Sequence, residues 1–275
     1  MKCPNCQVEN ESSAKTCSAC GAPLSRENGS VPPQALKAVT NTGLVLGKKA
    51  RMLRLNTPVD PKAIISDRAY NGAIAVVLLW GLLINYLMCS SYAVTSAVVR
   101  FYASNPIVFL IGYLVLALAG IFTSAKSHNP LVSFLGYNLV VIPFGLVITM
   151  LVWTYGGARS PVVSEAFLYT MLISVGMMAC VMIAPGFFSK IGGALLGVLI
   201  GLVVCEVVLL ILGVSQSWID WLAAGLFALY IGYDIYRSQQ YPKTLDNAVD
   251  SALDIYMDIA NLFIRILSIL GKRND

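Results

Sequence analysis

The last hydrophobic stretch of this chain, from Asp246 to Leu270, limits its fold more than any other segment. It is long enough to cross a bilayer, but it contains four aspartates at i, i+4 spacing and an arginine, Arg265, in its apolar half. An acidic side chain at the centre of a membrane helix costs roughly 2.5 to 3.5 kcal/mol, whereas each Leu, Ile or Phe returns only about 0.3 to 0.6 kcal/mol. The segment therefore cannot lie alone in lipid. We expect other helices to surround it and its aspartates to mark a functional site.

The composition is that of an integral, multi-pass membrane protein. Of the 275 residues, 57% are hydrophobic and only 12% are charged, whereas ordinary globular domains are about 25% charged. The first 30 residues contain no apolar core of a secretory signal, so no cleaved signal is expected. The lipid bilayer is therefore an expected partner of the protein. The modest net charge of +5 gives no reason to expect nucleic acid binding.

The polar N-terminus has the cysteine spacing of a zinc site. Residues 1–24 contain Cys3, Cys6, Cys17 and Cys20 as two C-x2-C pairs, which can supply the four thiolates of a tetrahedral Zn2+ shell. Two disulfides or a redox pair are the alternatives, and a reducing cytosol disfavours both. The segment resembles the small zinc ribbons at the N-termini of many bacterial proteins, which serve as interaction or regulatory modules. A bacterial cell membrane is therefore the expected location.

The rest of the chain divides into a connecting segment, 25–64, and a membrane domain, 65–275. Residues 25–43 are typical of a linker, and the basic residues that follow form either an amphipathic piece on anionic headgroups or an ordinary cytosolic flank. We expect an all-α membrane protein of seven transmembrane helices with a central C-terminal helix and a small N-terminal zinc ribbon. The expected spans are 69–92, 105–125, 130–155, 162–184, 191–212, 217–237 and 247–270.

The basic residues near the span ends indicate a cytosolic N-terminus. With that orientation ten of them flank the cytosolic side, and four lie outside: Arg100, Arg159, Lys272 and Arg273. The tail, Lys272 and Arg273, is the exception to this charge rule, by which Lys and Arg gather at the cytosolic ends of membrane spans. A re-entrant last segment, which would bring the tail inside, stays open. Gly193, Gly197 and Gly201, at i, i+4 spacing in the fifth span, predict a small-residue seam for close helix packing.

Helical geometry separates the aspartates of the last segment. Each i, i+4 step drifts by about 40°, so Asp254 lies about 40° from Asp258, and Arg265 lies about 20° to its other side. The expected functional face is therefore formed by Asp254, Asp258, Asn261 and Arg265. We interpret the two earlier aspartates, Asp246 and Asp250, as interfacial residues favoured by the helix dipole.

Asp234 supplies a partner for this face from the preceding span. A short connection makes the last two spans antiparallel neighbours, so Asp234 can face the acidic stripe. Two carboxylates in contact cannot both ionise cheaply, and such a pair would share a proton, sense pH and hold or repel a hard cation. The alternative is that Asp234 only pairs with Arg237.

These residues carry a family resemblance. The stretches SALDIYMDIANLFIRIL and GLFALYIGYDIYR resemble the last two helices of the transmembrane Bax-inhibitor-motif family, and the middle spans are also similar. The resemblance covers about residues 65–271 and implies seven helices with a central last helix. It also implies a pH-sensitive calcium leak channel, in which Asp234 and Asp258 match the pH-sensing pair and Asp254 matches a second aspartate of some members.

The chain departs from this family pattern in three places. Some members have a basic residue in the second span, whereas here the nearest are Lys126, at the end of that span, and Arg265, which could act in its place. Glu206 matches no residue of the family pattern. It either lines an outer pathway or forms a structural hydrogen bond in its protonated form. The zinc ribbon is an addition.

We therefore expect a proton-gated Ca2+ leak. The alternative is a stress regulator or interaction protein whose ribbon recruits a cytosolic partner. No enzyme is expected, because the only histidine, His128, lies in a short loop and no H-E-x-x-H motif is present, although a carboxylate pair also suits an aspartyl protease. A proton-coupled transporter stays open, and the sequence does not give the oligomeric state.

Overall fold

The computed structural model describes residues 63–213 and 217–274, and its secondary structure there is entirely helical. The predicted zinc ribbon and the basic segment lie outside these residues. The described helices are α3 (Asp67–Ser90), α4 (Tyr92–Ser104), α5 (Pro106–Lys126), α6 (Pro130–Thr154), α7 (Pro161–Ile183), α8 (Pro185–Ile211), α9 (Ser217–Ser238) and α10 (Leu245–Asn274).

Proline sets the start of four of the eight described helices. α5, α6, α7 and α8 each have a proline in the first turn, where the missing N–H costs no intrahelical hydrogen bond. Asn129 also caps α6 by accepting a hydrogen bond from the Leu131 N–H at 3.0 Å. The helices match the expected spans to within a few residues, except that α8 begins at Pro185 rather than at residue 191.

The helix α4 was not expected. α3 ends at Ser90, and Ser91 caps a second helix by accepting a hydrogen bond from the Val94 N–H. Five of the described helices, α3 and α5 to α8, are long and apolar enough to cross a membrane. α9 and α10 fall outside that group, and α10 carries the buried aspartates. Composition thus identifies a multi-pass membrane protein but does not by itself give seven spans.

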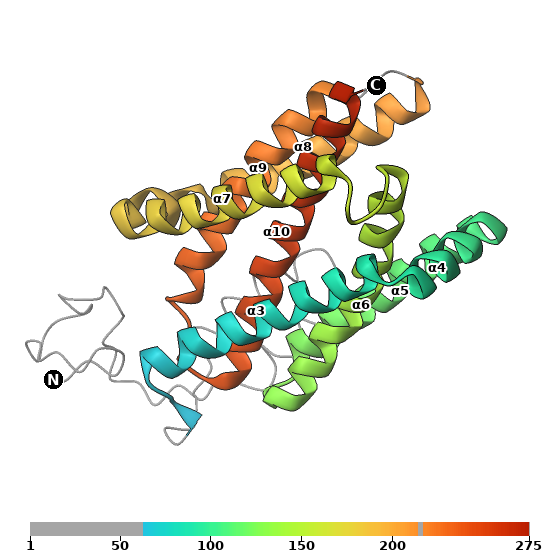
Figure 1. Cartoon of the computed structure of the whole chain (residues 1–275). Helices are drawn as coiled ribbons and strands as arrows, with labels where there is room; N and C mark the ends of the chain where they lie inside the picture. Colours follow the sequence, from blue (N-terminus) through green and yellow to red (C-terminus); the bar gives the residue numbers. More distant parts are fainter. Residues whose placement is uncertain (1–62, 214–216, 275) are drawn as a thin grey trace, which may run out of the picture. The chain divides into compact units, whose positions relative to one another are not determined.

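α10 is the central helix, as expected from its poor fit to lipid. It packs against α3, α6, α7 and α9, with the most extensive contact to α9 (Figure 1). α5 packs on the outer side of this group against α6, and α8 packs against α9. From residue 246 to residue 271 every side chain of α10 is buried or half-buried. The helix therefore holds its charges among protein side chains.

Close helix packing occurs at glycines other than the predicted seam. That prediction is wrong for the described residues: nothing lies within 4 Å of a Cβ placed at Gly193, Gly197 or Gly201. The close approach is instead between α5 and α6, where a Cβ at Gly120 would lie 2.6 Å from the carbonyl oxygen of Gly136. The periodicity of the seam did not reveal which face of α8 meets another helix.

We expect Gly120→Val to destabilise the membrane domain by about 1 to 3 kcal/mol, because the added carbons must push α5 away from α6. Gly112→Val is the matched control on the same helix, since a Cβ at Gly112 meets nothing within 4 Å. Thermal unfolding of the two purified variants in the same detergent measures the difference. Equal midpoints would show that α5 and α6 do not need this contact.

Candidate functional site: the acidic central helix

The first half of α10 carries buried aspartates. Asp246, Asp250 and Asp258 have only 6%, 9% and 8% of their surface exposed, and Asp254 is half-buried. Asp246 accepts a hydrogen bond from the Ser133 hydroxyl of α6. Asp250 accepts one from the Ser124 hydroxyl of α5.

These contacts add partners that the interpretation of Asp246 and Asp250 as interfacial residues did not include. Asp246 does lie in the first turn of α10, where the helix dipole favours a negative charge. Both carboxylates are nevertheless buried and hydrogen-bonded by serines from two other helices. The rotation of α10 could be read from the sequence, but the helices that cover each of its faces could not.

Tyr70 of α3 fixes the register of α9 against α10. Its fully buried hydroxyl donates to the Ser238 carbonyl at 2.9 Å and lies 3.1 Å from the Ser251 hydroxyl. Ser238 at the end of α9 is therefore level with Ser251 of α10. Because the helices are antiparallel, one turn along each brings Asp234 to the level of the turn between Asp254 and Asp258.

Asp234 has only 8% of its surface exposed and lies on α9, the helix in closest contact with α10. Its Oδ1 is 3.6 Å from Nη1 of Arg237, so the pairing considered as an alternative is present. The Arg237 guanidinium also lies over the rings of Tyr233 and Tyr241, at 5.6 and 5.5 Å from their centroids. These contacts hold Arg237 one turn from Asp234 on α9, on the side of the connection to α10.

The connection between α9 and α10 is tied to α3 near this acidic half. Lys243 lies 4.7 Å from the centroid of the Tyr70 ring and donates to Gln239 at 2.8 Å. Its backbone carbonyl accepts a hydrogen bond from the Ile65 N–H. Burial lowers the pKa of the Lys243 ammonium, while the charge of Asp67 acts in the opposite direction.

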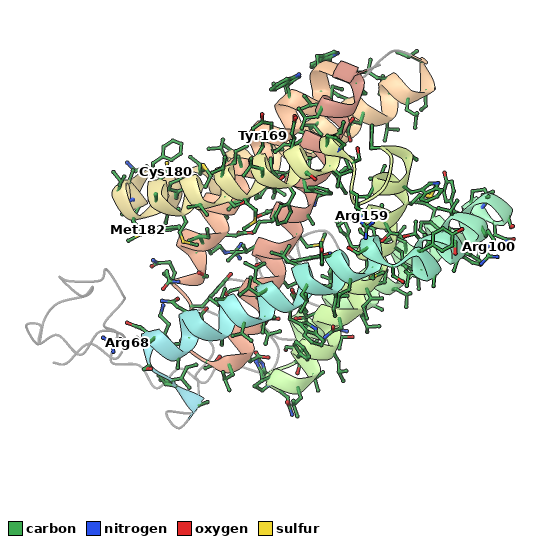
Figure 2. All side chains as sticks on the ribbon, viewed as in Figure 1. Arg68, Arg100, Arg159, Tyr169, Cys180 and Met182 are labelled. Atoms are coloured by element: carbon green, nitrogen blue, oxygen red, sulfur yellow. The ribbon has the colours of Figure 1, made fainter. Side chains whose placement is uncertain are left out.

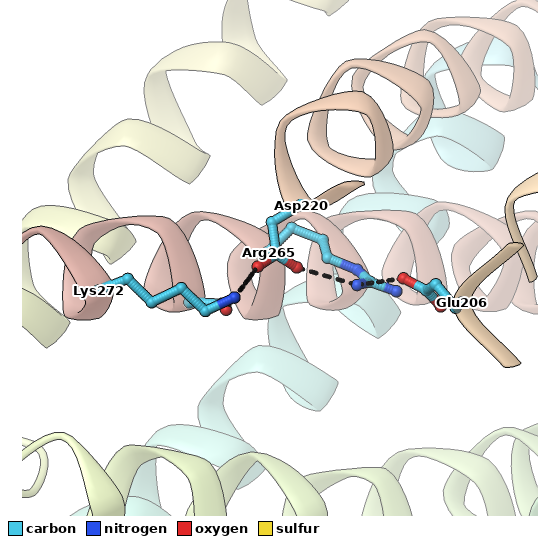
Figure 3. Close-up of polar contacts among 5 residues, drawn as sticks. Glu206, Asp220, Arg265 and Lys272 are labelled. Atoms are coloured by element: carbon cyan, nitrogen blue, oxygen red, sulfur yellow. Dashed lines mark hydrogen bonds and ion pairs between the residues drawn. The ribbon is translucent and has the colours of Figure 1, made fainter. Parts of the chain in front are cut away.

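A network of opposite charges joins α8, α9 and α10 at the other end of the bundle (Figure 3). Nη1 of Arg265 lies 3.0 Å from Oδ1 of Asp220 and forms an ion pair with Glu206. Oδ2 of Asp220 accepts from Ser268 and from Lys272, each at 2.8 Å. The network contains two carboxylates and two cations, so its formal charges balance.

The network changes the reading of three predicted residues. Arg265 was expected on the face of Asp258 as a substitute for the family's basic residue, and the structure shows it paired with Glu206 and Asp220. Glu206 is the partner of Arg265. Lys272, an exception to the charge rule, has its charge offset by Asp220. Sequence reasoning missed Asp220, although the unbalanced cation in the tail was a signal that a carboxylate was needed nearby.

The side-chain amide of Asn261 donates to the Met257 carbonyl of the same helix at 2.7 Å. Lys126 is exposed at the end of α5. No group of three or more His, Cys, Asp or Glu side chains that could hold a metal ion occurs within residues 63–213 and 217–274. The expected zinc ligands, Cys3, Cys6, Cys17 and Cys20, lie outside those ranges.

Comparison with known proteins identifies both parts of the chain. Residues 2–24 match the zinc-ribbon domain family. Two uncharacterized proteins of Helicobacter pylori, from strains 26695 and J99, are each 39% identical to this chain over 90 residues. That match spans 32% of the chain and only 38% of either relative. Residues 72–275 match the family described as inhibitor of apoptosis-promoting Bax1, and because the match covers well over half of the sequence, the chain belongs to this Bax inhibitor-1-like family.

Proposed function

We propose that this protein is a pH-sensitive leak channel for cations, Ca2+ among them, gated by Asp234 and Asp258. In this proposal α3 and α5 to α10 are seven membrane spans, and the N-terminus is cytosolic. The excess of Lys and Arg at the span ends that this orientation places in the cytosol supports it. The charged helices α9 and α10 can cross the bilayer because the other spans surround α10.

One observation carries the proposal: α10 is a central helix whose first half bears buried carboxylates. From Asp246 to Asp258 the helix rises about 18 Å, more than half of a hydrocarbon core of about 30 Å. Carboxylate oxygens are among the ligands that Ca2+ prefers, and here they come from α10, where serines of α5 and α6 donate hydrogen bonds to two of them. They form a path of oxygens from the α9–α10 connection to the middle of the bundle.

We assign the gate to Asp234 and Asp258, and the level of Asp234, beside the turn of α10 between Asp254 and Asp258, supports this assignment. When these carboxylates share a proton, a hydrogen bond can hold α9 against α10. When both are ionised, they repel each other and attract a divalent cation. Beyond Asp258 the next charge along α10 is Arg265, held by Glu206 and Asp220. A cation must pass this positive charge, so the network is the expected outer barrier.

The zinc-ribbon match favours a second candidate function, recruitment of a cytosolic protein to the membrane. The four cysteines of residues 2–24 are the donor set that a structural Zn2+ requires, and the ion would hold so short a segment in a folded form. In this second function the ribbon carries the activity and the membrane domain is an anchor.

Deleting residues 1–43 separates the two functions. We expect Ca2+ flux into liposomes by the truncated protein to stay within about twofold of the full chain, because the path of oxygens lies wholly in the membrane domain. Flux across pH into liposomes with the full chain is the reference. Capture of a cytosolic protein by the full chain, lost on deletion and accompanied by no flux from either protein, would favour recruitment instead.

A further inference from the structure

A cavity of about 290 Å3 lies between α3, α6, α7 and α10, and no aspartate or glutamate of the described residues lines it. Its walls are mainly apolar and include Leu82, Ile148, Val163, Phe167 and Phe263. An apolar protein cavity of about 150 Å3 stays dry and binds benzene. This cavity is nearly twice as large and has room for a run of methylene groups.

The polar groups in the wall have little to offer water. The hydroxyls of Ser164 and Thr170 donate to carbonyl groups of their own helix. The Asn85 amide donates to the Tyr256 hydroxyl. Its oxygen has no hydrogen-bond partner among the described residues, but it is closed off against Gly145, where a Cβ would collide with it. The cavity therefore favours an apolar occupant.

The cavity opens sideways toward the space that lipid occupies. Tyr86 of α3 and Phe167 of α7 line it and are 65% and 56% exposed. Both helices are apolar enough to span the membrane. Tyr86 lies one turn before the end of α3, and tyrosine at that depth is typical of the membrane interface. The mouth is thus placed where a lipid headgroup meets its acyl chain.

A positive charge lies beside the cavity. Ala158 lines it, and the next residue, Arg159, is exposed in the turn between α6 and α7 (Figure 2). Arg159 forms no ion pair with the part of the chain that the structure describes. The same turn leads into α7, whose N-cap residue, Ser160, makes no capping hydrogen bond through its side chain. An arginine beside an uncapped helix N-terminus suits a phosphate group.

We propose that this cavity binds one acyl chain of an anionic phospholipid, whose phosphate is held by Arg159 and the N-terminus of α7. The apolar walls of the cavity favour the acyl chain, and the positive charge of Arg159 favours an anionic headgroup. The site is separate from the carboxylates of the leak, so a protein that conducts no Ca2+ would still bind the lipid.

Native mass spectrometry of the full chain, with phosphatidylglycerol or phosphatidylcholine of the same acyl chains, tests this site. We expect one phosphatidylglycerol per chain, bound about tenfold more tightly than phosphatidylcholine. Arg159→Gln should remove this preference, and Ser164→Trp should fill the mouth and weaken both lipids. The matched controls are Arg100→Gln, another exposed arginine, and Ser189→Trp, another serine that bonds its own helix. They should leave binding unchanged.

Equal binding of the two lipids would overturn the proposal, as would equal losses in Arg159→Gln and Arg100→Gln, which would indicate adsorption by charge alone. If Ser164→Trp left the affinity for both lipids unaltered, the acyl chain would bind outside this cavity. Soluble glycerol phosphate should not displace the lipid at equal concentration, because it lacks the acyl chain. Displacement would contradict the role assigned to the cavity.

Discussion

Replacing Arg265 by glutamine is expected to lower the stability of the membrane domain by about 3 kcal/mol. Arg265 contacts both Asp220 and Glu206 in the network that joins α8, α9 and α10. Breaking a buried ion pair costs roughly 3 to 5 kcal/mol because a charge is left uncompensated. The low end applies here, since Nζ of Lys272 stays 2.8 Å from Asp220. Denaturant or thermal unfolding in detergent measures the loss.

Two comparisons separate this effect from the loss of any surface charge. Arg100→Gln removes an exposed arginine and should change stability by about 0.5 kcal/mol or less. Adding Glu206→Gln to Arg265→Gln should recover about 1 kcal/mol or more, since it removes a carboxylate that has lost its ion pair with Arg265. If Arg265→Gln is no more destabilising than Arg100→Gln, the network does not hold α8, α9 and α10 together.

The combined change Asp234→Asn and Asp258→Asn is expected to abolish the pH dependence of Ca2+ flux. Asparagine keeps the shape of aspartate but does not titrate, so the two helices can no longer respond to a proton. Ca2+ entry into liposomes, followed with an enclosed calcium dye while pH is stepped from about 5 to 8, measures the effect. The rate should become the same at every pH, whichever protonation state conducts in the unchanged protein.

Asp67→Asn is the control for this experiment. Asp67 is an exposed aspartate in the first turn of α3, outside the proposed path. Its replacement should leave both the rate and the pH profile as they are in the unchanged protein. A double variant that keeps the same flux and the same pH dependence would show that the gating mechanism is wrong.

Much of the fold followed from local signals in the sequence. The expected starts of α5, α6 and α7 lie within one residue of the prolines that begin these helices, whereas α8 begins at Pro185, six residues before its expected span. The energetic cost of the aspartates required α10 to be central. α4 was missed because the apolar pattern runs through Ser91, where only a capping hydrogen bond marks the break. Each of these signals depends on one helix alone, or on one helix and the lipid around it. It can therefore be read from the sequence without knowing which helices pack together.

Contacts between helices could not be predicted in the same way. The helical angle separated Asp250 from Asp258, but nothing in the sequence placed Ser124 beside Asp250. Arg265 shares its face with Asp258, and only the packing of α8 and α9 reveals that its guanidinium binds carboxylates on those helices. Such partners depend on the depth and rotation of two helices at once.

The most direct test of the central claim is Ca2+ entry into liposomes that contain the purified full chain, compared with protein-free liposomes across the same pH range. The arrangement of carboxylates along α10 predicts entry that is faster than in protein-free liposomes and whose rate changes with pH. Entry no faster than in protein-free liposomes at every pH would contradict the proposal that this helix carries a cation leak.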